Sequence, residues 1–195
     1  MFTGIIESIG TVAKIHKEEG GARFSIRTTA NLHLRIGDSI AVDGCCLTVV
    51  ERIKNIFSVV AVEETLMKTK LSHVSVSDTV NLERPMSAEG RFGGHIVLGH
   101  VDCVGVVKDV EHRETSRMFY FTVPAQFMPL LVSAGSVAVN GVSLTVAQLK
   151  KKSFGVSIIP HTHRVTTFGA LRPGNPVNIE FDVIGKYVQN LLHGK

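Results

Sequence analysis

The sequence predicts an all-β protein built from two similar domains, each a barrel or a sandwich, with only short helices. Residues 39–49 (SIAVDGCCLTV) return as residues 136–146 (SVAVNGVSLTV), with seven identities at a spacing of 97 residues. Residues 24–28 alternate apolar with polar side chains, as half-buried strands do, and 57–62 and 118–123 do so less strictly. Turn signals such as Asp43-Gly44 separate the runs, and many short strands with regular turns indicate a barrel or a sandwich.

The repeat extends beyond this stretch and divides the chain. Residues 80–83 (VNLE) match 177–180 (VNIE) at the same spacing of 97, whereas 2–10 match 97–105 at a spacing of 95. Each copy has roughly 90 residues, which lies within the usual range for a domain. We therefore expect one domain over residues 1–88 and a second over 89–182.

The segments between the matched stretches carry weaker signals. The increase in spacing predicts two extra residues in the second copy, in a hairpin between Val110 and Arg117. Residues 63–68 and 160–165 are each a short helical turn or a loop, and 124–132 favour a helix. A further helix is expected over 183–195, where apolar residues recur at helical spacing. Because so short a helix is marginal in water, we expect it to dock on another surface, such as a second subunit.

The composition excludes several classes of protein. The formal net charge is +4, but no run of basic residues exceeds Lys150-Lys151-Lys152, so a nucleic-acid partner is not expected. No window approaches the roughly 20 apolar residues of a membrane-spanning helix, and the N-terminus lacks the pattern of a signal peptide. Three cysteines, two of them adjacent, favour free thiols in a reducing compartment. We expect a cytoplasmic protein without a membrane partner.

The two copies differ at positions that carry chemistry. Ile5, Cys46 and Pro85 of the first copy correspond to His100, Ser143 and Asp182 of the second. A Ser-His-Asp triad is disfavoured, because Ser143 lacks the Gly-x-Ser-x-Gly context of a nucleophile elbow. A metal site formed by His95 and His100 is also disfavoured, because five residues along a strand place side chains on opposite faces. The residues alone therefore leave two interpretations open: two related ligand sites, or a duplication that is only structural.

Several motifs together resemble a known family. They are the N-terminal MFTGII, the doubled Gly-x-Cys/Ser-Leu-Thr-Val, the stretch Gly93-Gly94-His95 with Gly99-His100-Val101-Asp102, and residues 159–162 and 177–182. The chain resembles riboflavin synthases along essentially its whole length. Each motif is weak alone, and their combination is highly specific.

The resemblance implies a fold and a reaction. The fold is two tandem six-stranded Greek-key β-barrels plus a C-terminal α-helix, assembled as a homotrimer through that helix. Each barrel binds one 6,7-dimethyl-8-ribityllumazine, and the active site forms between the N-terminal barrel of one subunit and the C-terminal barrel of the next. Four carbons pass from one lumazine to the other, giving riboflavin and 5-amino-6-(D-ribitylamino)uracil. No cofactor or metal is needed, and a lumazine synthase capsid is an expected further partner.

The resemblance also implies roles for individual residues. The expected catalytic residues are His100, Ser143, Cys46, Ser39 and Asp182, with His100 and Ser143 carrying the proton chemistry. The expected substrate-binding residues are Phe2, Gly4, Ile6, Thr48, Glu64, Thr65, Val101, Thr145, Ile159 and Thr162. Of these sets, Phe2, Ser39, Cys46, Thr48, Glu64 and Thr65 are expected in the N-terminal barrel, and His100, Ser143, Thr145, Ile159, Thr162 and Asp182 in the C-terminal barrel.

The chain departs from the family pattern at three positions. Ala134 stands where the family often has a lysine, Asn140 where an aspartate is usual, and His163 where a leucine or isoleucine is common. The main alternative is a lumazine- or flavin-binding paralogue without catalytic activity. A flavin module for electron transfer is disfavoured, because no Gly-x-Gly-x-x-Gly follows any predicted strand. A purely structural module leaves the diverged copies unexplained.

Overall fold

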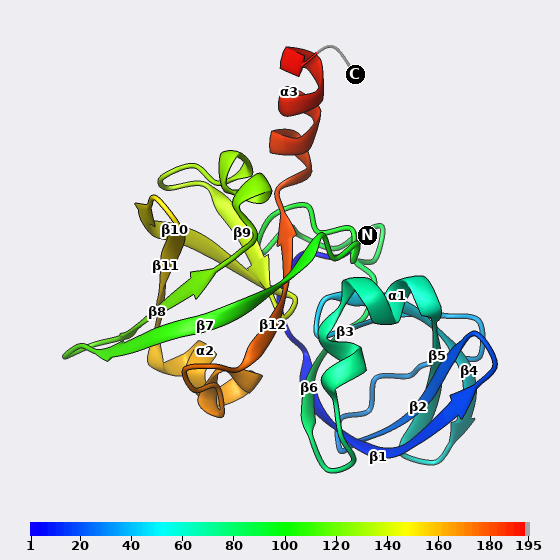
Figure 1. The fold of residues 1–195 in the computed structure, drawn as a ribbon. Helices are drawn as coiled ribbons and strands as arrows, with labels where there is room; N and C mark the ends of the chain where they lie inside the picture. The colour runs from blue at the N-terminus through cyan, green and yellow to red at the C-terminus, as the bar shows by residue number, and fades with distance from the viewer. Residues whose placement is uncertain (194–195) are drawn as a thin grey trace.

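Two closed antiparallel barrels of six strands lie side by side in the computed structural model, which describes residues 1–193 (Figure 1). Barrel 1 consists of β1 (Ser8–Glu18), β2 (Gly21–Thr28), β3 (Ser39–Val42), β4 (Cys45–Ile53), β5 (Ile56–Val62) and β6 (Thr79–Glu83). Barrel 2 consists of β7 (Cys103–His112), β8 (Arg117–Thr122), β9 (Ser136–Val139), β10 (Val142–Lys150), β11 (Ser153–Ile158) and β12 (Pro176–Phe181). The order around barrel 1 is β1-β2-β5-β4-β3-β6, and barrel 2 repeats it. The predicted pair of Greek-key barrels is confirmed.

Alternation of side chains fills both barrels. In β2, Ala22, Phe24 and Ile26 point into the core, while Arg23 and Arg27 point outward. Closure leaves no strand edge exposed to another chain. The core of barrel 2 is richer in aromatic rings, with the Phe119 and Phe168 centroids 5.1 Å apart in an edge-to-face arrangement.

The Asp43-Gly44 and Asn140-Gly141 turns meet where the barrels touch. All four residues have positive φ, between 45° and 77°, as a two-residue type I′ hairpin requires. A Cβ on Gly44 would lie 2.6 Å from the backbone nitrogen of Gly141, so no side chain fits between the two turns. These hairpins therefore pack against each other at a local pseudo-twofold axis.

Buried asparagines bind the barrels together across this axis. The Asn81 side chain donates to the backbone oxygen of Asn140 (2.9 Å), and the Asn178 side chain donates to that of Asp43 (2.8 Å). Each side-chain oxygen accepts from the opposite barrel as well: Asn178 from the Lys70 amide and Asn81 from the Thr167 amide. The repeated Val-Asn-x-Glu motif is therefore explained in part by its asparagine, which joins the two barrels.

The copies differ in charge beside this axis. Lys70 Nζ lies 2.8 Å from the buried Asp43 Oδ2, whereas the equivalent residues of the second copy are the neutral Thr167 and Asn140. Burial raises the pKa of Asp43, and the neighbouring Lys70 lowers it. Barrel 1 thus holds a buried ion pair that barrel 2 does without.

Short helices occupy the remaining segments. The ambiguous segments are helices α1 (Glu63–Lys68) and α2 (Pro160–Val165). The segment expected to be a helix over 124–132 contains only a 3₁₀ helix, η2 (Ala125–Leu130), because Pro129 lacks a backbone donor. Two further 3₁₀ turns are η1 (Lys70–His73) and η3 (Thr167–Gly169).

The C-terminal helix α3 (Val183–His193) projects away from the barrels (Figure 1). The last two residues of the predicted helix, 194 and 195, lie outside the described residues. Within residues 1–193, no helix has the length and apolar character that a membrane crossing requires.

The predicted position of the two-residue insertion is wrong. Ala22 pairs with Ala61 between β2 and β5, and Arg117 pairs with Ile158 between β8 and β11, so the spacing is still 95 at Arg117. It reaches 97 at Ser136, the start of β9. The extra residues therefore lie between β8 and β9, in the segment that contains η2. The β7–β8 hairpin does not contain the insertion, because its two strands pair in the same register as β1 and β2.

Candidate functional site

The repeated motif forms an outer platform on each barrel. On barrel 1, Ser39 pairs with Thr48 and Ala41 pairs with Cys46 across β3 and β4. Alternate residues of a strand face opposite sides. Ile40, Leu47 and Val49 belong to the core, so these four side chains point away from it. Ser136, Ala138, Ser143 and Thr145 form the same arrangement on β9 and β10.

The segment that precedes barrel 2 crosses over to the platform of barrel 1. The backbone oxygen of Gly99 accepts a hydrogen bond from the Cys46 amide at 2.9 Å. Gly99 has φ of 78°, and a Cβ there would lie 2.5 Å from the Cys46 Cβ, so only glycine permits this approach. Val101 then packs against the core of barrel 1. We name Ser39, Cys46 and Thr48 with the crossing residues 99–101 half-site 1.

The segment that precedes barrel 1 makes the reciprocal crossing. The backbone oxygen of Gly4 accepts from the Ser143 amide at 2.8 Å, and a Cβ on Gly4 would lie 2.6 Å from the Ser143 Cβ. Ile6 packs against the core of barrel 2. We name Ser143 and Thr145 with the crossing residues 4–6 half-site 2. Each half-site therefore combines residues from both copies.

Two buried glutamates hold the crossing segments. Glu83 accepts hydrogen bonds from the Thr3 amide (2.7 Å) and the Gly4 amide (3.1 Å). Glu180 accepts from the Leu98 amide (2.7 Å) and the Gly99 amide (3.0 Å). Burial raises the pKa of Glu83 and raises the pKa of Glu180 to about 7. The glutamates of the repeated Val-Asn-x-Glu motif thus fix the glycines that approach the platforms.

The crossing corrects the predicted grouping of residues. His100 was expected in the C-terminal barrel, but it follows Gly99 on the segment that lies over Cys46 of barrel 1. Phe2 was expected in the N-terminal barrel; it pairs with Val97 and packs between the barrels. Sequence reasoning failed here because each copy was assumed to hold its own leading segment.

The histidine that contacts Ser143 is His95. Its Nδ1 lies 2.7 Å from Ser143 Oγ, and burial lowers the pKa of His95 while the charge of Asp182 raises it. Its Nε2 is buried and has no hydrogen-bond partner among the described residues, so Asp182 does not complete a triad. Comparison of the two copies gave no role to His95, because at a spacing of 95 no residue of the first copy corresponds to it. The signal available in the sequence was the glycine pair Gly93-Gly94 before it. In the structure, a Cβ on Gly94 would lie 2.8 Å from Ser143 Oγ.

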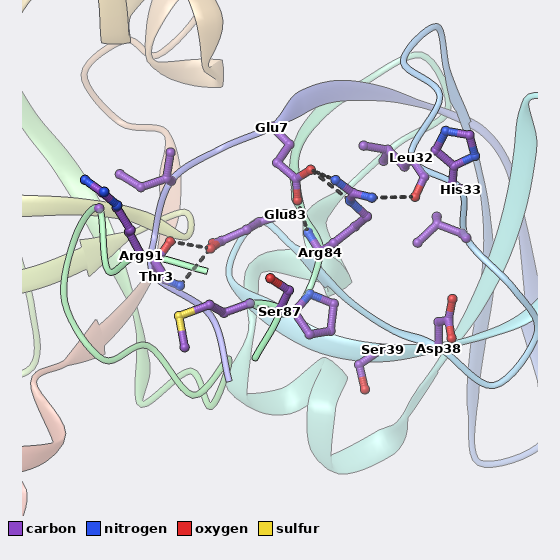
Figure 2. Close-up of a pocket in the computed structure, with 15 residues that line it drawn as sticks. Thr3, Glu7, Leu32, His33, Asp38, Ser39, Glu83, Arg84, Ser87 and Arg91 are labelled. Atoms are coloured by element: carbon purple, nitrogen blue, oxygen red, sulfur yellow. Dashed lines mark hydrogen bonds and ion pairs between the residues drawn. The ribbon is translucent and has the colours of Figure 1, made fainter. Parts of the chain in front are cut away.

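Ser39 lies on a cavity of about 590 Å³ beside the N-terminal crossing segment. Figure 2 shows Thr3 bonded to Glu83 on one side of this cavity, Glu7 paired with Arg84 on another, and Ser39 beyond them. Asp182 lines a corresponding cavity of about 390 Å³ together with Ser136 and the start of α3. The structure thus places Ser39 and Asp182 in equivalent recesses of the two barrels.

The remaining predicted residues lie at the helices that follow β5 and β11. Glu64 and Thr65 are on α1, where Glu64 pairs with Lys68 at 2.6 Å. Ile159 precedes α2 and Thr162 lies on it. These helices follow strands adjacent to β4 and β10, which carry the platforms. Among residues 1–193, no three His, Cys, Asp or Glu side chains are grouped as a metal site would require.

The comparisons with known proteins match this two-part arrangement. The family model described as Lumazine binding domain matches residues 3–85 and again 98–182. A riboflavin synthase of Actinobacillus pleuropneumoniae is 42% identical over 193 residues, covering 98% of this chain and 90% of that protein. The chain belongs to the riboflavin synthase family. Riboflavin synthases of Bacillus subtilis (41% identity, 99% and 90% coverage) and Mycobacterium tuberculosis (40%, 98% and 98%) are similarly close.

The riboflavin synthase family shares its fold with other solved proteins. LumP complexed with 6,7-dimethyl-8-(1'-D-ribityl) lumazine has a TM-score of 0.85 and covers 93% of this chain and 99% of its own. The complex of LumP with riboflavin has a TM-score of 0.87 at the same coverage. At 23% identity, these structures support the fold of this riboflavin synthase family member and no more.

Proposed function

We propose that the protein is a riboflavin synthase that converts two molecules of 6,7-dimethyl-8-ribityllumazine into riboflavin and 5-amino-6-(D-ribitylamino)uracil. The observation that carries the proposal is the pair of half-sites, which have the same backbone geometry and different side chains. Half-site 1 contains Cys46 and His100, and half-site 2 contains Ser143, whose hydroxyl contacts His95. Two platforms of one shape suit two molecules of one substrate, and their different side chains suit two roles.

The reaction needs proton transfer and the close approach of two flat rings. One lumazine must lose a proton from a ring methyl group, and the other must be attacked by a nucleophile. Burial lowers the pKa of His95, which favours the neutral imidazole, and a neutral imidazole can accept a proton. The contact with His95 orients the Ser143 hydroxyl toward this exchange. Proton transfer of this kind contributes roughly 10²–10⁴-fold, and no cofactor is required for it.

We propose a homotrimer in which the half-sites of neighbouring subunits face each other. Thr48, Thr145 and His100 are exposed in the single chain, so each platform is open on one side. Tyr187 (68% exposed) and Leu191 (82%) present apolar surface on α3, and burying such surface stabilises association. Sedimentation velocity should give a trimer, and Leu191→Glu should give smaller species with lower activity. A monomer with full activity would contradict the shared site.

The decisive test is turnover of pure protein with 6,7-dimethyl-8-ribityllumazine, followed by riboflavin absorbance. Riboflavin should appear without added metal or cofactor. One mole of riboflavin should form for every two moles of lumazine consumed. Ser143→Ala should lower the rate far more than lumazine affinity, while Ser72→Ala, an exposed serine remote from both half-sites in the chain, should change neither. Tight lumazine binding without turnover would instead support a ligand-binding paralogue.

Two further proposals concern the setting of this enzyme. We propose that it works in the cytoplasm, where its free Cys45, Cys46 and Cys103 remain reduced. We also propose that it associates with a lumazine synthase capsid, which would supply the substrate locally. Co-sedimentation with a purified capsid, with serum albumin as the control protein, tests the second proposal; equal recovery with both would contradict it.

A further inference from the structure

A positively charged recess lies between the β7–β8 hairpin and α2. It has a volume of about 360 Å³, and its lining includes His112, Arg113, Arg117, His163, Arg164 and a single acidic residue, Glu114. The recess uses Pro160, His163 and Arg164 of α2, whereas the residue expected to bind lumazine on this helix is Thr162. Its lining contains none of the residues of half-site 2, and Ile158 and Pro160 of the lining flank Ile159, an expected substrate-binding residue.

The positive charges of the recess have few negative partners. In the described part of the chain, no carboxylate lies within 4.0 Å of Arg117 or Arg164, and Arg113 reaches Glu111 only at 3.4 Å. A guanidinium nitrogen of Arg117 contacts the His163 ring. Burial lowers the pKa of His163, and Arg117, Arg172, His112 and Arg164 lower it further. The lowered pKa favours the neutral His163 ring, which can accept a hydrogen bond from Arg117. The positive charge without a carboxylate partner therefore lies on Arg117 and Arg164, and a bound anion would balance it.

The fold does not require these charges, because barrel 1 lacks them. The residues at the positions of Arg113, Arg117, His163 and Arg164 in the first copy are Glu18, Ala22, Leu66 and Met67. Two of the acidic residues at that end of barrel 1 form ion pairs, Glu18 with Arg23 (2.7 Å) and Glu64 with Lys68 (2.6 Å). The cluster is thus specific to the second copy, and among its arginines only Arg113 has a carboxylate within 4.0 Å in the described residues.

We propose that this recess binds a small phosphate-bearing anion. Arginine forms paired hydrogen bonds with phosphate oxygens, and the lining of the recess includes two such groups, Arg117 on β8 and Arg164 on α2. A concave recess suits a compact ligand, either inorganic phosphate or a phosphate monoester, better than it suits the convex surface of an acidic protein. The bound anion would tie α2 to the β7–β8 hairpin. The proposal does not rest on the lumazine reaction.

Thermal unfolding of the full-length protein tests the site. Inorganic phosphate should raise the unfolding temperature in a saturable way, relative to chloride at the same ionic strength. Ribose 5-phosphate, compared with ribose, tests for a monoester ligand. Arg164→Met introduces the residue that barrel 1 carries at this position, and it should weaken phosphate binding at least tenfold. Arg117→Met should do the same, and Arg23→Met in barrel 1 is the matched control that should leave binding unchanged.

The outcomes separate the alternatives. Because Arg164 is exposed, Arg164→Met is expected to fold, and circular dichroism verifies this before titration. Equal stabilisation by chloride and phosphate would show general salt screening and would overturn the proposal. Phosphate binding that survives both Arg164→Met and Arg117→Met would place the anion elsewhere and would also overturn it. A change in sedimentation instead of phosphate affinity would assign the cluster to contact between chains.

Discussion

Gly99→Ala should disrupt half-site 1 specifically. The φ of Gly99 is 78°, in the left-handed region that side chains disfavour, and the added Cβ would lie 2.5 Å from the Cys46 Cβ and 3.0 Å from the Cys46 nitrogen. Both groups belong to β4, which is fixed in the barrel by pairing with β3 and β5. The crossing segment must therefore move away from barrel 1. Gly20→Ala is the matched control, since Gly20 has φ of 76° and nothing within 4 Å of its would-be Cβ.

The expected loss of stability is the sum of two effects. A left-handed conformation costs a non-glycine residue about 1–2 kcal/mol, and this cost applies to both variants. Gly99→Ala also breaks the 2.9 Å hydrogen bond from the Cys46 amide, which contributes about 1 kcal/mol, and displaces packed atoms. We expect the free energy of unfolding to fall by about 2–4 kcal/mol for Gly99→Ala, and by about 1–2 kcal/mol for Gly20→Ala.

Urea denaturation and lumazine titration together check this reasoning. Gly99→Ala should retain the lumazine site of half-site 2, so the stoichiometry should fall from two ligands per chain to one, and turnover should be lost. Gly20→Ala should bind two ligands and remain active. Equal destabilisation of the two variants, with two ligands bound by each, would refute the close approach of Gly99 to Cys46.

Three further predictions concern the buried groups. Lys70→Met leaves the Asp43 carboxylate buried without a counter-charge and should cost about 3–5 kcal/mol in urea denaturation, and adding Asp43→Asn should recover most of the loss. Because burial raises the pKa of Glu180 to about 7, its contribution to stability should be lost as the pH rises from about 4.5 to about 7, by at most about 3 kcal/mol; Glu180→Gln should flatten this dependence. His95→Ala should lower kcat by roughly 10²–10⁴-fold, whereas His100→Ala should mainly weaken lumazine binding at half-site 1.

Each of these predictions has an outcome that contradicts it. No recovery in the Lys70 and Asp43 double variant would show that the lysine acts through packing instead of charge. An unchanged pH profile after Glu180→Gln would assign the titration to another group. If His100→Ala lowered kcat as much as His95→Ala at saturating lumazine, the contact between His95 and Ser143 would not explain the proton chemistry.

The sequence predicted the two barrels because their determinants are local and repeated. Alternation marks β2, and the two-residue turn at Asp43-Gly44 returns at Asn140-Gly141, so the second copy reinforced the first. The repeat also located the platforms, since Cys46 and Ser143 fall at equivalent positions of β4 and β10.

The crossing could not be predicted from the repeat. An alignment of the copies shows that Gly4 corresponds to Gly99, but both arrangements, crossed and uncrossed, preserve that correspondence. The choice depends on contacts between residues far apart in sequence, such as the Ser143 amide and the Gly4 oxygen. The same limit hid the pairing of His95 with Ser143.

The exchanged leading segments tie the histories of the two copies together. A substitution in residues 2–6 alters the surroundings of Ser143, and one in residues 97–101 alters those of Cys46, so neither copy can drift without changing the site assigned to the other. A chain with one copy alone would lack the leading segment that crosses over its platform. The two copies therefore form one structural unit, whose halves differ at paired positions such as Cys46 and Ser143.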